Sequence, residues 1–556
     1  MNVPKVKSNL IDDMVGYFNP RAKMQRMRSK MALAYMEDSG YITPRSSRKS
    51  MRGSNAVDYS ADRDTAPKVR GSRALSRDMY MNTPLMVSIL DRFKVNVVGA
   101  GLVPQPSPDT QFLGLDPVTA ATWVRNVQRE FNLWASSPFS SWSNNQTFWD
   151  LQGLALLSVL MNGDAFFALP WKQAPDSRHP YELKIKLIEA DLVRNPLTSG
   201  WDAGVPLPGS PDIVGGIEYA DGQLVAYHVA DKYFLDPYSG SVNFQRIPAW
   251  DASGRRQMSQ IFDPARIGQR RGMPLLASTL EMMKQLSRLT ESQLMGALVR
   301  SLFTVFVKDM SGLGGAIQEG FIPADTVGGG GGAGPDAEQQ QKDPVAAWEL
   351  EMAHGNVVFL DDDKEIQLAD PKGTDVGFEP FFDALVTQIA ASVGQSKSQA
   401  LIKFDASYSA ARGEILEVWK TYRTRRAWFS RSFLQPVYEA FLEEAIIKGR
   451  IDAPGFLTDS GKRHAWSACA WVGPGMGQLD PLKEANAAVT KIKNGLATCE
   501  EEYTADRGGS WPAMMERRSR EKTLFGELGL PDPTDAPAVM QPAAPTPEVP
   551  PADGEK

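Results

Sequence analysis

The sequence predicts an α+β fold that is divided among several packed regions. Apolar residues recur every four positions between residues 85 and 97, a spacing typical of an amphipathic helix. From about residue 181 to 250 the apolar pattern instead shifts toward a period of two, which indicates β-strands. With 556 residues, the chain is longer than one hydrophobic core normally supports. We therefore expect helices and strands to be shared among more than one domain.

The composition excludes several classes of protein. No run of eighteen uncharged apolar residues occurs, so no membrane-spanning helix is expected. Asp12 and Asp13 lie where a secretory signal would carry its apolar core, which argues against export by that route. Cys469 and Cys499 are the only cysteines, too few for a disulfide framework, and we expect buried, inert thiols in a reducing cytoplasm.

The first 75 residues form a basic segment. They hold 15 Lys and Arg against 7 Asp and Glu, a balance of +8, whereas the whole chain carries −6. Because the segment also lacks apolar periodicity, residues 1–75 are predicted to be a mobile arm with one short helix at 21–36. The arm is either a solvated tail or a contact for nucleic acid or for a neighbouring subunit.

Residues 76–273 are predicted to fold as one compact α+β domain, which residues 451–478 complete. Helices are expected near 76–98, 118–136 and 146–161, and Gly and Pro in "VVGAGLVPQPSP" end the first of them. Strands follow, two of them joined by the turn Ala220–Asp221–Gly222. His179 and His228 lie far apart in the sequence and have no matching carboxylates near them, so no metal site is expected there.

Two amphipathic helices, at 274–302 and 376–394, flank an acidic insert. The insert, residues 303–375, holds 14 Asp and Glu against 4 Lys, a balance of −10. Apolar strands on either side of Asp361, Asp362 and Asp363 predict a β-hairpin with an acidic tip, suited to a basic protein partner. Clustered carboxylates also suit Mg²⁺, so a nuclease using Asp361, Asp363 and Lys364 is the alternative; however, consecutive residues of a turn point in different directions.

A polar loop at residues 395–410 precedes a long helix at 411–450. The helix carries Arg423, Arg425, Arg426 and Arg431, which could stay solvated, pair with the acids of a neighbouring subunit, or face DNA. A helical block is expected at 479–530. Residues 531–556 contain 8 prolines and almost no large side chains, which predicts a disordered tail.

No catalytic motif accompanies this organisation. The chain has no G-x-S-x-G elbow, no Walker A loop, no H-E-x-x-H and no cysteine-rich metal spacing. Four histidines leave little material for general base catalysis. We therefore expect a protein that is not an enzyme and that binds neither a cofactor nor a metal.

Four segments, taken in order, resemble the lambda-type portal family of tailed bacteriophages. They are "SRALSRDMYMNTPLMVSILDRFKVNVVGAGLVPQ", "FDPARIGQRRGMPLLASTLEMMKQL", "SYSAARGEILEVWK" and "LDPLKEANAAVTKIKNGLAT". The resemblance implies the portal fold, in which 76–273 with 451–478 form the wing and 274–302 and 376–394 the stem helices. It further implies that 303–375 form the clip, 395–410 the tunnel loop, 411–450 its supporting helix and 479–530 the crown.

The resemblance also implies a function: a ring of about twelve subunits at one capsid vertex, through which DNA is packaged and ejected. The partners it implies are terminase, head-completion or adaptor proteins, major capsid and scaffold proteins, and double-stranded DNA held without sequence preference. Such a protein belongs to the virion and passes through the host cytoplasm during assembly; a capsid or scaffold protein is a second structural alternative.

The same resemblance assigns roles to particular residues. The acidic tip, Asp361 to Asp363, would contact clip partners, and the four arginines of the long helix would pair between subunits. The tunnel loop would present the following residues to the channel: Lys397, Lys403, Asp405, Ser407, Ser409 and Arg412.

Overall fold

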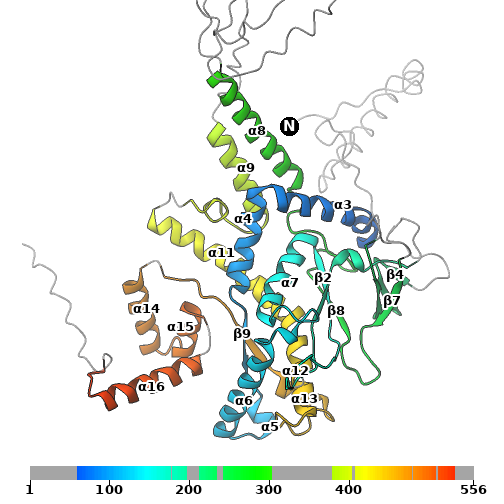
Figure 1. Cartoon of the computed structure of the whole chain (residues 1–556). Helices are drawn as coiled ribbons and strands as arrows, with labels where there is room; N and C mark the ends of the chain where they lie inside the picture. Colours follow the sequence, from blue (N-terminus) through cyan, green and yellow to red (C-terminus); the bar gives the residue numbers. More distant parts are fainter. Residues whose placement is uncertain are drawn as a thin grey trace, which may run out of the picture. The chain divides into compact units, whose positions relative to one another are not determined.

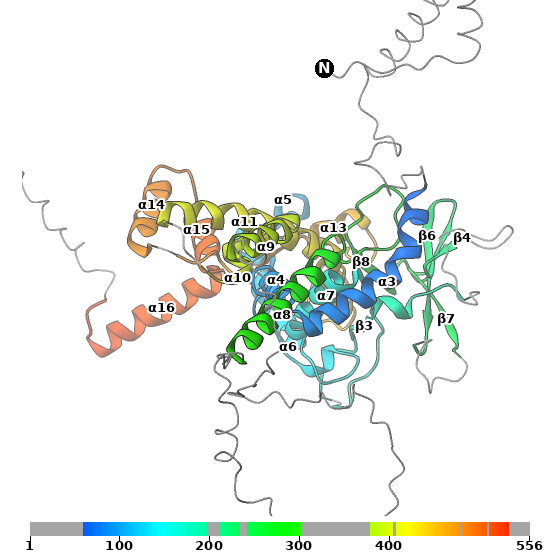
Figure 2. The same cartoon turned by 90° about the horizontal axis from the view of Figure 1, so that it is seen from above.

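The structure, a computed structural model, describes residues 59–176, 178–196, 212–233, 242–302, 378–403, 407–478, 480–508 and 511–532. The chain divides into two compact units, Met1–Ser60 and Ala61–Lys556, and the elements below belong to the second. Figures 1 and 2 show them in two views. The predicted helix at 21–36, the acidic insert and the Pro-rich tail from residue 533 lie outside the described residues.

The first described helix, α3, spans Ala61–Asn82, so it begins well before the boundary predicted at residue 75. Its inner face holds Val69 and Met79, and its first turn is fixed by the buried Asp62, which accepts a hydrogen bond from the backbone N–H of Arg270 at 2.9 Å. Residues 61–75 therefore belong to the folded unit and not to a mobile arm. Their buried side chains contact residues that lie far away in the sequence, such as Arg270.

Helix α4, Pro84–Phe93, continues into a π-helical turn at Lys94–Val98 and ends at two glycines, as the sequence predicted. Gly101 has a φ of +122°, and a Cβ at this position would lie 2.9 Å from the ring of Trp149. The chain then enters strand β1, Val103–Pro106, which pairs antiparallel with β9, Cys469–Val472. This pairing joins two segments that are more than 360 residues apart in the sequence.

Two of the helices predicted between residues 76 and 273 lie within two residues of their predicted bounds. Helix α6 spans Pro117–Ala135 and is capped by Asp116, and α7 spans Phe148–Asn162 behind a capping box. The short α5, Thr110–Leu113, precedes them. Phe131 of α6 packs edge to face against Phe148 of α7 and against Phe441 of α12, and Trp134 of α6 lies tilted against Phe441. These buried rings place the main core between α6, α7 and α12.

Two antiparallel sheets lie beside this core. In one, β2 (Asp164–Ala168) lies between β3 (Lys186–Ile188) and β8 (Met258–Phe262). The other sheet has four strands in the same order as in the sequence: β4 (Asp212–Val214), β5 (Ile217–Ala220), β6 (Gln223–Ala230) and β7 (Phe244–Pro248). The predicted turn is confirmed: Asp221 and Gly222 have φ values of +50° and +75°, the left-handed conformation of a tight hairpin.

Helix α8, Leu280–Leu302, leads away from the sheets, and α9, Phe378–Ser392, returns beside it (Figure 1). The sequence predicted a start near residue 274, but hydrogen-bonded turns occupy residues 274–279. The short helix α10, Lys397–Leu401, follows within the predicted loop. The predicted helix at 411–450 consists of α11 (Tyr408–Phe429), a π-helical turn (Ser430–Leu434) and α12 (Gln435–Ile447).

The remaining helices are α13 (Ser460–Ser467), α14 (Pro481–Lys493), α15 (Cys499–Asp506) and α16 (Trp511–Leu528). The last three correspond to the helical block predicted at 479–530. None of the helices that the structure describes is long and apolar enough to cross a membrane. The prediction of a mixed α and β fold is confirmed.

Candidate functional site

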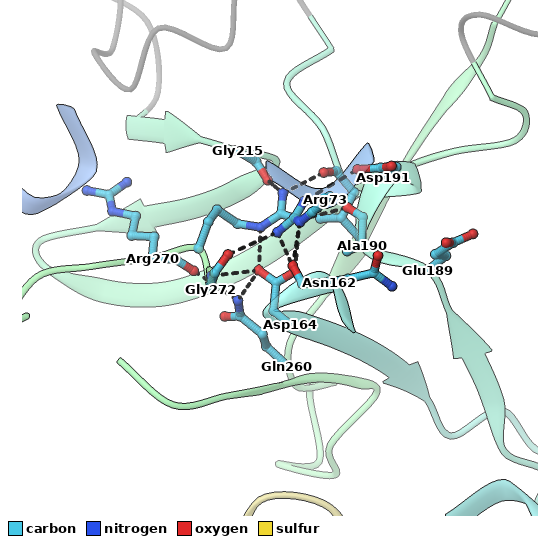
Figure 3. Close-up of polar contacts among 12 residues, drawn as sticks. Arg73, Asn162, Asp164, Glu189, Ala190, Asp191, Gly215, Gln260, Arg270 and Gly272 are labelled. Carbon is cyan, nitrogen blue, oxygen red and sulfur yellow. Dashed lines mark hydrogen bonds and ion pairs between the residues drawn. The ribbon is translucent and has the colours of Figure 1, made fainter. Parts of the chain in front are cut away.

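A buried ion network joins the start of β2 to the segment that precedes α8 (Figure 3). At its centre is Asp164, whose side chain is inaccessible to solvent. Each carboxylate oxygen accepts more than one hydrogen bond, from two arginines, the Gln260 amide and the backbone N–H of Gly272. Burial would raise the pKa of Asp164, but the charges of Arg271 and Arg73 outweigh it and hold that pKa below its ordinary value. Asp164 is therefore a buried carboxylate that stays ionised.

Arg271 uses its whole guanidinium in this network. Nε and Nη2 donate to Asp164 at 2.7 and 3.2 Å. Nη1 and Nη2 also donate to three backbone carbonyls at 2.6 to 2.8 Å. These are the carbonyls of Ala190, Val193 and Gly215. Since only 6% of the side chain is exposed, these bonds compensate for the loss of hydration.

Arg73 brings helix α3 into the same network. Its Nη2 donates to Asp164 at 2.6 Å, and its Nε donates to the carbonyl of Asn162 at 2.7 Å. Burial lowers the pKa of Arg73 to about 10, so the side chain remains cationic at neutral pH. Asp191, at 3.5 Å, supplies the second negative charge. The positive charges of Arg73 and Arg271 are therefore matched by the negative charges of Asp164 and Asp191.

Two glycines allow the backbones to meet beside the network. A Cβ on Gly272 would lie 1.9 Å from the carbonyl oxygen of Gly163, and a Cβ on Gly163 would lie 2.3 Å from the carbonyl carbon of Met273. Gly163 also has a φ of +89°. The network and the glycine contact fix the chain eight residues before α8 begins, so they determine where that helix leaves the sheets.

Sequence reasoning did not identify this network. The available signals were an aspartate inside the apolar run "NGDAFFALP" and the arginine pair in "RRGMP". A charged residue between buried strand positions requires partners, but the sequence does not say which of 60 lysines and arginines supply them.

The predicted tunnel loop is partly ordered around α10. The ammonium of Lys397 donates to Asp383 of α9 at 2.6 Å, and Lys403 lies 3.8 Å from Glu379 of the same helix. The amide of Gln395, which is buried, donates to the carbonyl of Ile89 at 3.1 Å. Both lysines thus have acidic partners on α9, and their expected place in the channel stays a prediction.

The remaining loop residues lie near the start of α11. Asp405 lies outside the described residues. Ser407 is the N-cap residue of α11, and Ser409 is exposed in its first turn. The guanidinium of Arg412 forms an ion pair with Glu484 of α14, so it ties the predicted supporting helix to the predicted crown.

The four arginines of the predicted inter-subunit set divide into two pairs. Arg425 binds Asp263 of the same chain at 2.7 Å. Arg426 donates to the carbonyls of Asn96, Val97 and Pro474 at 2.8 to 3.0 Å, and burial, followed by the charge of Arg423, lowers its pKa to about 10. Within this chain, these two side chains therefore join segments that are distant in the sequence, and their expected pairing with a neighbouring subunit stays a prediction. Arg423 and Arg431 are exposed and form no hydrogen bond or ion pair with the described residues.

Arg423 and Arg431 line a groove of about 940 Å³. The end of α11, strand β9 and helix α15 form its walls. Trp419 and Trp471 provide aromatic surface within it.

The third predicted site, Asp361 to Asp363, lies outside the described residues. Within the described ranges, no group of three or more His, Cys, Asp or Glu side chains is arranged to hold a metal ion. The best-defined polar cluster that they do contain, around Asp164, is closed to solvent and serves to join segments of the fold.

The chain belongs to the lambda family of phage portal proteins: the profile described as "Phage portal protein, lambda family" matches residues 47–426. It is 26% identical to the portal protein of Escherichia phage N15 and 24% identical to portal protein B of Escherichia phage lambda. Each alignment covers 501 residues, which is 87% of this chain and 89% of the relative.

Among solved structures, the chain is similar to a protein in the neck of a native gene transfer agent particle computed with C12 symmetry. The identity is 12% and the TM-score 0.36, over 78% of this chain and 92% of that chain. Membership of the portal family makes the protein a structural component of the phage virion.

Proposed function

We propose that the chain assembles into a closed ring of about twelve subunits at one capsid vertex, and that this ring is the channel for DNA packaging and ejection. Family membership supports the role, and the helix pair α8 and α9 carries the argument for a ring. Leu294, Met295 and Phe381 are 55 to 61% exposed on these helices. Large apolar side chains on paired helices are a surface that a neighbouring subunit would cover.

The channel would be lined by residues 395–410. Lys397 and Lys403, 35% and 58% exposed, would supply positive charge without reading bases, because phosphate contacts carry no sequence information. Their ion pairs with Asp383 and Glu379 weaken the attraction for DNA. Weak attraction suits a duplex that must slide, since each additional phosphate contact adds to the affinity that holds it still.

The remaining regions would keep the roles that the family implies. Residues 76–273 with 451–478 would be the wing, 274–302 and 376–394 the stem helices, and 479–530 the crown. The clip, 303–375, would dock terminase and head-completion proteins through Asp361 to Asp363, and the ring as a whole would meet capsid and scaffold proteins. Assembly would take place in the host cytoplasm.

Sedimentation of the purified protein tests the proposal. At micromolar concentration and moderate salt we expect one species with the mass of a closed ring, about twelve times the 61.1 kDa of the chain. A protein that remains monomeric over a hundredfold range of concentration would overturn the proposal.

A further inference from the structure

The groove between α11, β9 and α15 is lined by arginines and by three glutamates. Each glutamate already has a partner within the chain: Glu439 accepts from the amide of Gln435 at 3.1 Å, Glu501 accepts from the backbone N–H of Thr498 at 2.9 Å, and Glu502 forms an ion pair with Lys491 at 3.0 Å. Arg423 and Arg431 have no such partner among the described residues. The groove therefore favours an occupant that carries carboxylates.

The groove also offers aromatic surface, because Trp419 and Trp471 line it. Proline-rich segments dock on aromatic grooves because their extended helix is preformed, and their backbone is rich in free carbonyls and poor in N–H donors. An extended segment that combines prolines with acids would satisfy both the arginines and the aromatic surface.

This chain contains a segment of that composition. Residues 533–556, PTDAPAVMQPAAPTPEVPPADGEK, hold seven prolines and four acids against one lysine. They follow helix α16, whose end points away from α11 in both views (Figures 1 and 2). The direction of this helix favours the groove of a neighbouring subunit over the groove of the same chain.

We propose that the groove binds the C-terminal segment 533–556 of a neighbouring subunit. The inference rests on the proposed ring and names the partner of Arg423 and Arg431 within it. A groove on one subunit and a different segment on the next form a head-to-tail contact, which closes into a ring when it repeats. In an extended conformation, 24 residues reach about 70 Å at 3.1 Å per residue, enough to span adjacent subunits.

A binding measurement tests the groove itself. A chain that ends after Asp532 leaves the groove empty, and a synthetic peptide of residues 533–556 is titrated into it while tryptophan fluorescence is followed. We expect saturable binding that weakens with salt and that falls at least tenfold in Arg423→Ala/Arg431→Ala. The matched control is Lys68→Ala/Arg70→Ala, two exposed cations on α3, which should bind as the parent does. Absence of binding at millimolar peptide, or equal binding by the groove variant, would overturn the proposal.

A cross-link identifies which subunit supplies the tail. In a background of Cys469→Ala and Cys499→Ser, Ala427→Cys in the groove and Ala544→Cys in the tail are introduced together and oxidised, which leaves Arg423, Arg431 and the acids of the tail in place. Binding to a neighbour predicts a ladder of covalent oligomers in a denaturing gel, whereas a bond within one chain gives only monomers and contradicts the assignment. A parallel sample of the full-length parent protein is sedimented. Rings without a ladder refute this inference alone, and absence of rings refutes the proposed function.

Discussion

The guanidinium of Arg271 holds the carboxylate of Asp164 through two hydrogen bonds, from Nε at 2.7 Å and from Nη2 at 3.2 Å. The pair joins the first residue of β2 to the segment that leads into α8, over 107 positions of sequence. Because both side chains are buried, the direction in which α8 leaves the sheets depends on a contact that solvent does not screen.

Replacing Asp164 with Asn should destabilise the protein strongly. The amide keeps the shape of the side chain but leaves Arg271 and Arg73 without their central countercharge in a buried site. Breaking a buried ion pair in this way lowers the free energy of unfolding by about 3–5 kcal/mol. Urea unfolding of the parent and the variant measures this difference. Glu189→Gln, which changes a half-exposed partner of Arg77, should cost under about 1 kcal/mol; equal losses in the two variants would contradict a central role for Asp164.

The same pair makes stability depend on pH in a defined direction. The pKa of Asp164 is lower in the folded protein than its ordinary value of 3.8. The contribution of Asp164 to the free energy of unfolding is therefore complete above pH 3.8, and it is lost as the pH falls through the lower pKa of the folded protein. We expect the difference in unfolding free energy between the parent and Asp164→Asn to be constant from pH 7 to pH 5 and to shrink below pH 4. A difference that grows with acidification would show that the sign is wrong.

Gly272→Ala tests the backbone contact. Its Cβ would lie 1.9 Å from the carbonyl oxygen of Gly163, so the strand and the segment before α8 have to separate. We expect a loss of several kcal/mol and a failure to form rings. Gly71→Ala is the matched control, because this exposed helical glycine has open space around it and should stabilise α3 by about 1 kcal/mol. Thermal unfolding compares the two; a harmless Gly272→Ala would show that this contact does not position α8.

Lys397 and Lys403 separate two explanations of the channel loop. Lys397→Ala/Lys403→Ala should leave ring formation unchanged and reduce DNA packaging or retention. Asp383→Asn removes the partner of Lys397 but keeps its charge. If the lysines act on DNA, this variant packages normally. A defect equal to that of the double variant would instead show that Lys397 matters only as an anchor of α10.

Changing Asp361, Asp362 and Asp363 together to Asn should weaken binding of the packaging motor while rings still form. Binding should weaken because residues 303–375, whose net charge is −10, lose three of the negative charges that would attract a basic partner. Pull-down of the motor by parent and variant rings measures the effect. Normal capture by the variant would remove the acidic tip from the account, and plasmid cleavage by the parent with Mg²⁺ would revive the nuclease alternative.

Local patterns predicted much of the fold, because spacing and capping act within a few residues. The bounds of α6, α7 and α9 and the turn at Asp221 and Gly222 follow from apolar periodicity, Asp and Thr caps and a glycine. The buried face of α11 and the π-helical turn has the same local origin, since Val418, Tyr422, Phe429 and Phe433 recur at helical spacing.

Contacts between distant segments could not be predicted in the same way. The partners of Arg425 and Arg426 lie on other elements, and an arginine on a helix looks the same in sequence whether it binds a carbonyl or faces solvent. The start of α3 was missed for a similar reason, because Asp62 and Arg73 are held by residues near 164 and 270. The four arginines could therefore be named from the sequence but not assigned to individual roles.

Electron cryo-microscopy of the purified protein tests the central claim most directly. The account predicts closed rings with an axial channel, in which residues 395–410 line the channel and α8 packs against α9 of the same and of the adjacent subunit. Rings with the 395–410 segment on their outer surface, or particles without an axial channel, would contradict it.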